Sequence, residues 1–264
     1  MTYPHRPASQ AANLRLDAPV ARPWTVTPQG HPARIMQPSR RYEVLWQDHN
    51  GSLAELTKVA PAMPAFETAF TAFARGALIA TPSGEVAIED LLPGTLIQTR
   101  LGPLPVRWIG RITLPPANLK QDGGPDIFRV SADAFGPQRP APDLVLCSGA
   151  RLVHRVARLA AQRTGPDLLV PIADFADGVH VTQINPMSSV TAYHLALDSH
   201  SVIEVNRLAV ETYHPGSHLP EGLTGDLLRL FLSLFPHLRE PSDFGPLALP
   251  RLGLDAIDDL AATA

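Results

Sequence analysis

Cys147 is the side chain of this sequence best suited to nucleophilic chemistry, and it is the only cysteine in the chain. It follows the apolar run 144–146 and precedes Ser148. A thiolate is a strong nucleophile, but a free cysteine in an apolar run is usually a buried and unreactive core residue. We expect a buried thiol and keep the nucleophile as the alternative. A single cysteine also excludes an internal disulfide and a cysteine-based zinc site.

Four histidines in the second half of the chain are available as metal ligands: His194, His200, His214 and His218. The last two are four residues apart, a spacing that places two zinc ligands on one face of a helix. Pro215 and Gly216 lie between them and disfavour a helix there. We therefore expect no metal site. The sequence contains neither a P-loop nor a G-x-G-x-x-G stretch, and we expect no cofactor.

The composition is that of an ordinary globular protein, with 264 residues, 45% apolar and 18% charged. A net charge of -3 gives no electrostatic reason to expect a nucleic acid or an anionic membrane as partner. The basic residues do not alternate with aromatic ones, as a nucleic-acid surface requires. No apolar run approaches the ~20 residues that span a membrane. Residues 1–23 lack the apolar centre of a signal peptide, so the default expectation is a cytoplasmic protein, although leaderless export would leave no trace.

Short apolar runs between glycine and proline residues predict that most of the chain is β-structure. The expected strands cover residues 78–81, 86–88, 96–99, 106–109, 127–130, 143–146, 167–172, 179–184, 191–197 and 201–206. Residues 153–162 fit either a strand or a short helix. Residues 42–60 fit a hairpin around an Asn50-Gly51 turn, followed by a connector. Because isolated hairpins are only marginally stable in water, we expect this one to pack on the main domain.

Both ends of the chain differ in character from the middle. Residues 1–41 combine proline with arginine and show no hydrophobic periodicity, so we expect a mobile tail, with a basic docking arm as the alternative. Near the other end, apolar residues recur at helical spacing over 227–235, between a possible N-cap at Asp226 and the helix-breaking Pro236. A helix this apolar must bury a broad face, either on the domain or on a partner protein.

The stretch 72–110 carries several residues in a fixed order. The opening part has Phe73, Gly76, Leu78, Ile79, Thr81, Pro82 and Gly84, and the later part has Glu89-Asp90-Leu91, Pro93-Gly94 and Trp108-Ile109-Gly110. This order resembles the opening of the bacterial Hint (Hedgehog/intein) family, which reads C-F-x-x-G-T-L-I-x-T-P-x-G, then V-E-D-L-x-P-G-D and W-I-G. The resemblance implies an all-β fold of two related subdomains joined in a flat horseshoe.

The sequence departs from this family at the position of the nucleophile. Hint domains open on a cysteine whose thiol attacks the preceding carbonyl and converts an amide into a thioester, and the matching position here holds Ala72. A methyl group cannot attack, since this step needs a side-chain nucleophile. The hydroxyl of Thr71 lies one residue too early and faces a different peptide bond.

The sequence also departs from the family at the assisting histidine. The bacterial subgroup often has S-P-D-H-R after an apolar strand, and its histidine polarises the scissile amide or protonates the leaving nitrogen. Here Gly149 stands in place of the aspartate and Ala150 in place of the histidine, while Arg151 matches. His154 lies about 13 Å farther along a strand, at ~3.3 Å per residue, and is too far away to substitute.

The resemblance resumes at the end of the domain. Tyr193-His194-Leu195 and Asp198-Ser199-His200 match a strand and a D-x-H turn, and residues 211–216 match the closing E-S-[FY]-x-P-G. The resemblance implies that His194, Asp198 and His200 are possible remnants that support acid/base chemistry. The alternative is that His194 packs on a strand face while Asp198 and His200 shape the turn. The His-Asn pair that drives intein splicing has no counterpart.

These observations predict a mainly β chain in four parts. They are a tail at 1–41, a hairpin and connector at 42–65, a Hint-like β domain at 66–216 and a C-terminal helical extension at 217–264. We expect a Hint-domain protein that has lost autoprocessing and works as a binding or scaffold module, with a protein partner held through the apolar helix 226–236. The alternative is self-cleavage at the Thr71-Ala72 bond by a nucleophile other than cysteine.

Overall fold

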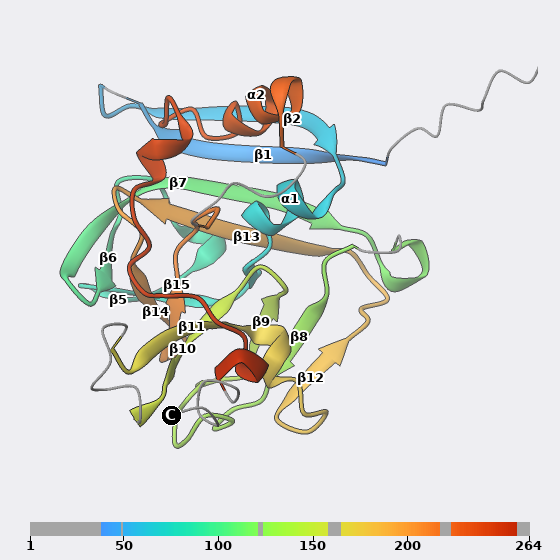
Figure 1. The fold of residues 1–264 in the computed structure, drawn as a ribbon, viewed down its shortest axis with the longest axis vertical. Coiled ribbons are helices and arrows are strands. Elements are labelled where there is room, and N and C mark those ends of the chain that lie inside the picture. The colour runs from blue at the N-terminus through green and yellow to red at the C-terminus, as the bar shows by residue number, and fades with distance from the viewer. Residues whose placement is uncertain (1–37, 49, 121–123, 158–164, 217–222, 258–264) are drawn as a thin grey trace, which may run out of the picture. The chain divides into compact units, whose positions relative to one another are not determined.

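The computed structural model describes residues 38–48, 50–120, 124–157, 165–216 and 223–257 (Figure 1). Most of the expected tail at 1–41 lies outside these residues. The described part is mainly antiparallel β-structure, as the sequence predicts, and fifteen strands form one connected sheet. Within that part, no helix has the length and apolar character needed to cross a membrane.

The strands follow one another closely along the chain. They are β1 (Ser39–Gln47), β2 (Leu53–Pro61), β3 (Phe73–Ala74), β4 (Leu78–Thr81), β5 (Gly84–Ala87), β6 (Leu96–Thr99), β7 (Gly102–Leu114), β8 (Ile127–Val130), β9 (Leu144–Cys147), β10 (Arg151–Arg155), β11 (Asp167–Pro171), β12 (Val181–Ile184), β13 (Val190–Leu197), β14 (Val202–Val205) and β15 (Leu208–Glu211). The predicted hairpin is confirmed as β1 and β2, with β1 beginning at Ser39 rather than at residue 42.

The longest strand, β7, is the element on which the N-terminal hairpin and the main domain meet. It pairs with β6 near its start and with β1 and β13 over its later part. The sequence predicts only residues 106–109 as a strand, because Gly102, Pro103, Pro105 and Gly110 look like strand breaks. Gly102, Pro103 and Pro105 pair only with β6, which leaves their other side free, while Gly110 pairs with both Val44 and His194.

Helices are few and short in the described residues. They are α1 (Pro64–Glu67), α2 (Gly225–Leu232) and several single 3₁₀ turns, among them η1 (Thr68–Phe70) and η2 (Ile88–Asp90), while residues 254–257 form one helical turn. The predicted C-terminal helix is confirmed as α2, but its N-cap is Thr224 rather than Asp226. Asp226 lies in the first turn, where it forms an ion pair with Arg229.

An aromatic core joins segments that are distant in the sequence. The Trp108 ring stacks on Phe235 with a centroid distance of 4.8 Å, and its indole N–H donates to the Leu234 carbonyl at 2.8 Å. Phe70, from just before the main domain, packs edge-on against Trp108 at 5.2 Å. Gly110 makes room for these rings, because a Cβ there would lie 2.3 Å from Trp108 and 2.5 Å from Phe70. We define this aromatic core by the fully buried residues Tyr42, Phe66, Phe70, Trp108, Phe231 and Phe235.

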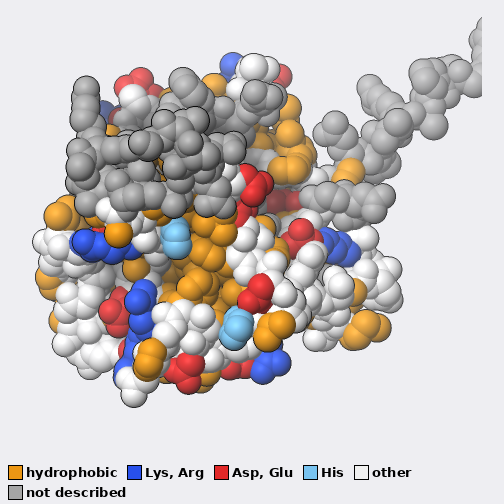
Figure 2. Space-filling view, turned by 60° about the horizontal axis from the view of Figure 1, so that its bottom comes forward, with side chains coloured by type: hydrophobic (Ala, Val, Ile, Leu, Met, Phe, Trp, Pro, Cys, Tyr) orange, Lys and Arg blue, Asp and Glu red, His pale blue; other side chains and the backbone are white. Residues whose placement is uncertain are grey.

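The segment of α2 and the residues after it are partly buried on the domain. Phe231, Leu234 and Phe235 are fully buried in the aromatic core of the chain itself. These three residues therefore cover their own domain, while Leu227, Leu228, Leu230 and Leu232 are only partly buried. On the face shown in Figure 2, hydrophobic side chains gather near the middle and charged side chains lie mainly around them.

Candidate functional site

The peptide bond between Thr71 and Ala72 lies where the chain enters the main domain. Strand β3 follows it and pairs with β13 on one side and with β9 on the other. The N–H of Ala72 donates to the Tyr193 carbonyl at 2.9 Å, and the Ala72 carbonyl accepts from the N–H of Cys147 at 2.9 Å. Thr71 and Ala72 are both fully buried. The sheet therefore fixes this bond from both sides and excludes water from it.

The backbone of Gly149 binds the Thr71 carbonyl, the group that a nucleophile would have to attack. Its N–H donates to the Thr71 carbonyl oxygen at 2.8 Å. A Cβ on Gly149 would lie 2.5 Å from that oxygen and 2.7 Å from the carbonyl oxygen of Thr68, closer than real Cβ contacts occur. The backbone of residue 149 therefore packs directly on the Thr71-Ala72 junction. Only glycine allows this close approach, so an aspartate at this position does not fit the observed geometry.

The two positions that match the family's cysteine and histidine carry only methyl groups. Ala72 and Ala150 are fully buried and belong to one hydrophobic cluster, together with Phe73, Leu146 and Leu195. The Thr71 hydroxyl donates to the Glu67 carbonyl at 2.9 Å, within the preceding turn. A methyl group at 72 supplies no nucleophile, and a methyl group at 150 supplies no acid or base.

Cys147 and Ser148 are distant from the junction in sequence but lie close to it in space. The Cys147 backbone N–H bonds the Ala72 carbonyl, while the Ser148 N–H donates to the Asp126 carbonyl. The thiol of Cys147 is fully buried in the aromatic core, and burial raises its pKa to about 12. In the described residues, neither the Cys147 thiol nor the Ser148 hydroxyl forms a hydrogen bond with the Thr71 carbonyl. The thiol is therefore protonated at neutral pH and is a poor nucleophile.

A buried ionic cluster lies under the C-terminal segment, and its centre is Glu211. The carboxylate accepts from Arg151 at 3.0 Å, from the Nε of Arg251 at 3.0 Å and from the Nε2 of His200 at 3.2 Å. Burial alone would raise the pKa of Glu211, but the bond from His200 and the two guanidinium groups hold it below its ordinary value. Glu211 is therefore a paired carboxylate with no proton to donate at neutral pH.

Hydrogen bonds assign the tautomers of two histidines in this region. The N–H of Ala248 donates to Nδ1 of His200 at 2.9 Å, so the proton of the neutral His200 ring lies on Nε2 and points at Glu211. The N–H of Gly216 donates to Nδ1 of His214 at 3.0 Å, and Nε2 of His214 donates to the Gly245 carbonyl at 2.9 Å. Both rings thus serve to bind residues 245–248 to the domain.

The three possible remnants do not form one group. His194 is buried between the rings of Phe73 at 5.6 Å and Tyr213 at 5.3 Å, and burial lowers its pKa to about 3. Asp198 lies at the surface, where it binds Arg107 through both carboxylate oxygens at 2.6 and 3.0 Å. His194 and His200 are therefore buried on the side of Glu211, while Asp198 belongs to a separate surface ion pair.

The other histidines considered above lie apart from the junction. The partly exposed ring of His154 packs on Phe175 at 5.8 Å. His218 lies outside the described residues. Within the described ranges, no three His, Cys, Asp or Glu side chains are grouped as a metal ion would require.

Sequence reasoning missed the ionic cluster as a site, although three of its four members lie in matched motifs, His200 as the end of the D-x-H turn. Arg151 follows the vacant histidine position, and Glu211 opens the closing motif. Their 3.0 Å contact joins these two stretches in space. Arg251 comes much later, in a stretch with no recognisable pattern, and its role could be found only from the fold.

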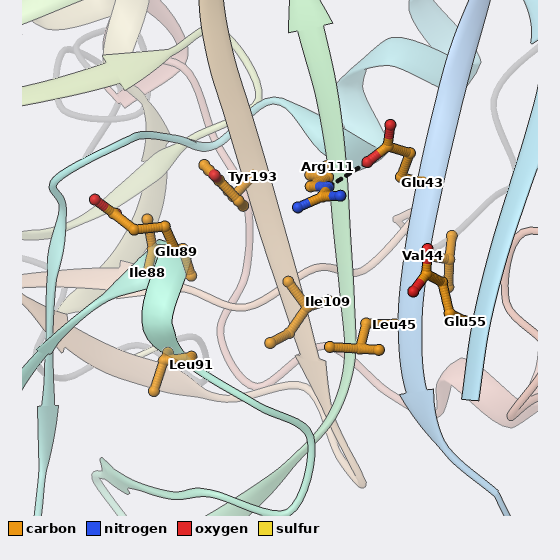
Figure 3. Close-up of a pocket in the computed structure, with 10 residues that line it drawn as sticks. All are labelled: Glu43, Val44, Leu45, Glu55, Ile88, Glu89, Leu91, Ile109, Arg111 and Tyr193. Carbon is orange, nitrogen blue, oxygen red and sulfur yellow. Dashed lines mark hydrogen bonds and ion pairs between the residues drawn. The ribbon is translucent and has the colours of Figure 1, made fainter. Parts of the chain in front are cut away.

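A pocket of about 110 Å³ is lined by residues of β1, β7, β13 and η2, together with Glu55 of β2 and Leu91 (Figure 3). Ile88, Leu91 and Ile109 line its apolar part, next to Tyr193, whose carbonyl accepts the Ala72 N–H. Its charged members include Arg111 and Glu43, which form an ion pair with each other. This arrangement suits an apolar group and contains no nucleophile with an adjacent base.

Comparison with known proteins gives one family match. The family model described as the Hint domain matches residues 71–217. The matched stretch begins at Thr71 and so contains the junction, Gly149, Ala150 and Glu211. No curated protein matches the chain.

Proposed function

This chain belongs to the Hint domain family, and from that premise we propose that it is a Hint-domain protein that does not cleave itself and that works as a binding or scaffold module. The observation that carries the proposal is the state of the Thr71-Ala72 bond. Both residues are fully buried, and both carbonyls accept backbone hydrogen bonds. The positions matching the family's cysteine and histidine carry methyl groups, which cannot transfer a proton or form an acyl bond.

The residues before the junction also support a protein that stays in one piece. Tyr42, Phe66 and Phe70 are fully buried in the aromatic core, where Phe66 packs edge-on against Phe231 at 5.6 Å. Strand β1 pairs with β7 over residues 42–46. Cleavage after Thr71 would leave this segment held by the sheet and the core. An upstream segment that is part of the core is poorly suited to release.

The pocket beside Tyr193 supports the binding half of the proposal. Its apolar part adjoins a charged rim, a combination common in sites that take an apolar side chain with a polar neighbour. The pocket is reached from the surface, while the junction itself is buried. A bound group would therefore contact Ile109 and Tyr193 without access to the Thr71 carbonyl.

The alternative is self-cleavage at Thr71-Ala72 by a nucleophile other than cysteine. One contact favours it, since the Gly149 N–H that binds the Thr71 carbonyl is placed to stabilise an oxyanion there. A donor of this kind assists only when a nucleophile attacks. The nearest thiol, Cys147, is protonated and packs in the aromatic core.

The test restores the missing thiol. We expect the wild type and the variant Ala72→Cys to remain single species near 28.5 kDa during incubation with hydroxylamine at neutral pH. Without the histidine at 150, the amide lacks the acid that would assist its breakdown. Ala74→Cys is the matched control, because it places a thiol on the same strand away from the junction. Splitting of the wild type at Thr71-Ala72 would contradict the proposal, and splitting of Ala72→Cys but not of Ala74→Cys would show that the thiol alone is missing.

A further inference from the structure

Strand β2 is an edge strand of the sheet, and among the described residues no strand pairs with its outer side. It pairs with β1 over nine residues, from Ser39 opposite Pro61 to Gln47 opposite Leu53, and has no second partner strand among the described residues. Figure 1 shows it at the margin, beyond β1 as seen from β7. A strand edge of this length presents a row of backbone groups that can bind another strand.

Two hydrogen bonds fix which groups of β2 point outward. The N–H of Ala62 donates to the Pro38 carbonyl at 2.7 Å, and the N–H of Asp48 donates to the Ser52 carbonyl at 2.9 Å. Both bonds join even-numbered residues that continue the register of the β1–β2 pair. In an antiparallel pair, residues whose backbone groups bond to the neighbouring strand alternate with residues whose backbone groups point away from it. The even-numbered residues of β2 therefore bond to β1. The groups that point to the open edge belong to Leu53, Glu55, Thr57 and Val59.

This edge has few of the features that usually prevent strand addition, and Glu55 is its one exposed charged residue. The β1–β2 ladder has no bulge, and β2 has no proline before Pro61. The residues with outward backbone groups also have exposed side chains, and two of them are large and apolar, with Leu53 51% and Val59 67% exposed. Lys58, the one basic residue of the strand, is half-buried on the opposite face.

We propose that β2 pairs antiparallel with β2 of a second copy of this chain, with Leu56 opposite the partner's Leu56. In an antiparallel pair, residues that bond directly have outward groups on both strands, so an odd-numbered residue must face an odd-numbered one. The proposed register satisfies this rule. Leu53 then faces the partner's Val59, Glu55 faces the partner's Thr57, and roughly eight backbone hydrogen bonds form.

The neighbouring registers are less favourable for reasons visible in the sequence. A shift one way places Glu55 opposite the partner's Glu55, which sets like charges against each other. A shift the other way places Leu53 opposite the partner's Pro61, which has no N–H to donate. Only the proposed register pairs each exposed apolar side chain with another. Leu53 of each copy then faces Val59 of the other copy, which gives two such pairs related by the twofold axis of the dimer. This inference does not depend on whether the protein cleaves itself.

Light scattering on the purified full-length chain tests the association. We expect a species of about twice 28.5 kDa. Thr57→Pro should convert it to a monomer, since it removes an outward N–H and leaves the bonds to β1 in place. Thr57→Val, which keeps the N–H, should remain a dimer. A wild type that is monomeric at all concentrations would overturn the proposal.

Disulfide formation between single introduced cysteines tests the register of the β2–β2 pair. Cys147 is buried and leaves little background reactivity. Under mild oxidation, Leu56→Cys should form a disulfide-linked dimer, since the two copies of residue 56 face each other across the axis. Glu55→Cys and Thr57→Cys should not form one, because neither faces its own copy in this register. Cross-linking of either of these instead of Leu56→Cys would show a different register and contradict the proposal.

Discussion

The N–H of Gly149 lies 2.8 Å from the carbonyl oxygen of Thr71 and donates a hydrogen bond to it. This contact places the stretch 147–150 directly on the bond that the family's chemistry would break. This stretch begins at the end of strand β9, which pairs with β3. The hydrogen bond from the Cys147 N–H to the Ala72 carbonyl fixes its register. The backbone of 147–150 thus packs tightly on the junction, while the side chains at 72 and 150 are methyl groups.

Gly149→Ala should lower the free energy of unfolding by about 3 kcal/mol. The added Cβ would lie 2.5 Å from the Thr71 oxygen, and the atoms it meets are backbone, which cannot easily move. Thermal or denaturant unfolding measures the loss. The control is Gly253→Ala, where the nearest atom is a carboxylate oxygen of Asp174 at 3.1 Å and can shift. Equal stability of the two variants would show that the junction is looser than described.

Glu211→Gln should destabilise the protein by about 3 kcal/mol at pH 7, since it leaves Arg151 and Arg251 facing a neutral group. The folded-state pKa of Glu211 lies below its ordinary value of 4.5, so its carboxylate stabilises the fold above that pH. This contribution is lost as the pH falls through the folded-state pKa. The difference between variant and wild type should therefore narrow below about pH 4.5, as denaturant titrations at several pH values would show.

The matched control is Glu204→Gln on the neighbouring strand β14, where the side chain is exposed. We expect a change within about 0.5 kcal/mol there. A loss at Glu204 as large as that at Glu211 would argue against a special role for the buried cluster.

His194→Phe should make the protein more resistant to acid. Burial lowers the pKa of His194 to about 3 in the folded state, against an ordinary value of 6.5. Below pH 6.5 the unfolded chain binds a proton that the folded chain does not, so stability falls as the pH drops towards 3. Phenylalanine removes this effect, which amounts to about 2 kcal/mol at pH 5 relative to pH 8.

Unfolding experiments at pH 5 and pH 8 compare the two proteins, with the partly exposed His154→Phe as control. The same pH dependence in His194→Phe and wild type would mean that His194 is charged or accessible in the folded state. The edge contacts of His194 with Phe73 and Tyr213 are of a kind that phenylalanine can keep.

Cys147 should resist alkylation in the native protein. Its thiol is fully buried and its pKa is raised to about 12, so the reactive thiolate is scarce at pH 8. Iodoacetamide followed by intact mass measurement should show no added group until denaturant is present, when one group is added. Rapid labelling of the native protein would show an accessible thiol and would strengthen the alternative in which Cys147 acts as nucleophile.

The sequence predicts the family and the mainly β fold, because these depend on local patterns. Glycine and proline bound runs such as Leu78–Thr81 and Leu96–Thr99, and these strands appear with the predicted ends. The same residues conceal the length of β7. Pro105 lies where the partner changes from β6 to β13, whereas Gly110 is paired on both sides and leaves room for the rings of Trp108 and Phe70. Strand β15 was missed because its four residues run into the closing motif.

The parts of the site that the sequence did not predict depend on contacts between distant segments. Glu211 meets Arg251 only because residues 245–254 fold back over the domain, and no periodicity in that stretch indicates this. Trp108 meets Phe235 because the chain that follows α2 packs on β7, a contact between distant segments that no local pattern predicts. By contrast, the vacant positions at 72 and 150 follow from motif spacing alone.

The most direct test of the central claim examines the junction itself. Trypsin cleaves after Lys58 and Arg75, so the peptide 59–75 contains the Thr71-Ala72 bond. After prolonged incubation of the wild type with hydroxylamine at neutral pH, mass spectrometry should recover this peptide intact and unmodified. Recovery of residues 59–71 ending in a hydroxamate, together with residues 72–75, would show that the bond is activated without a cysteine and would contradict the account.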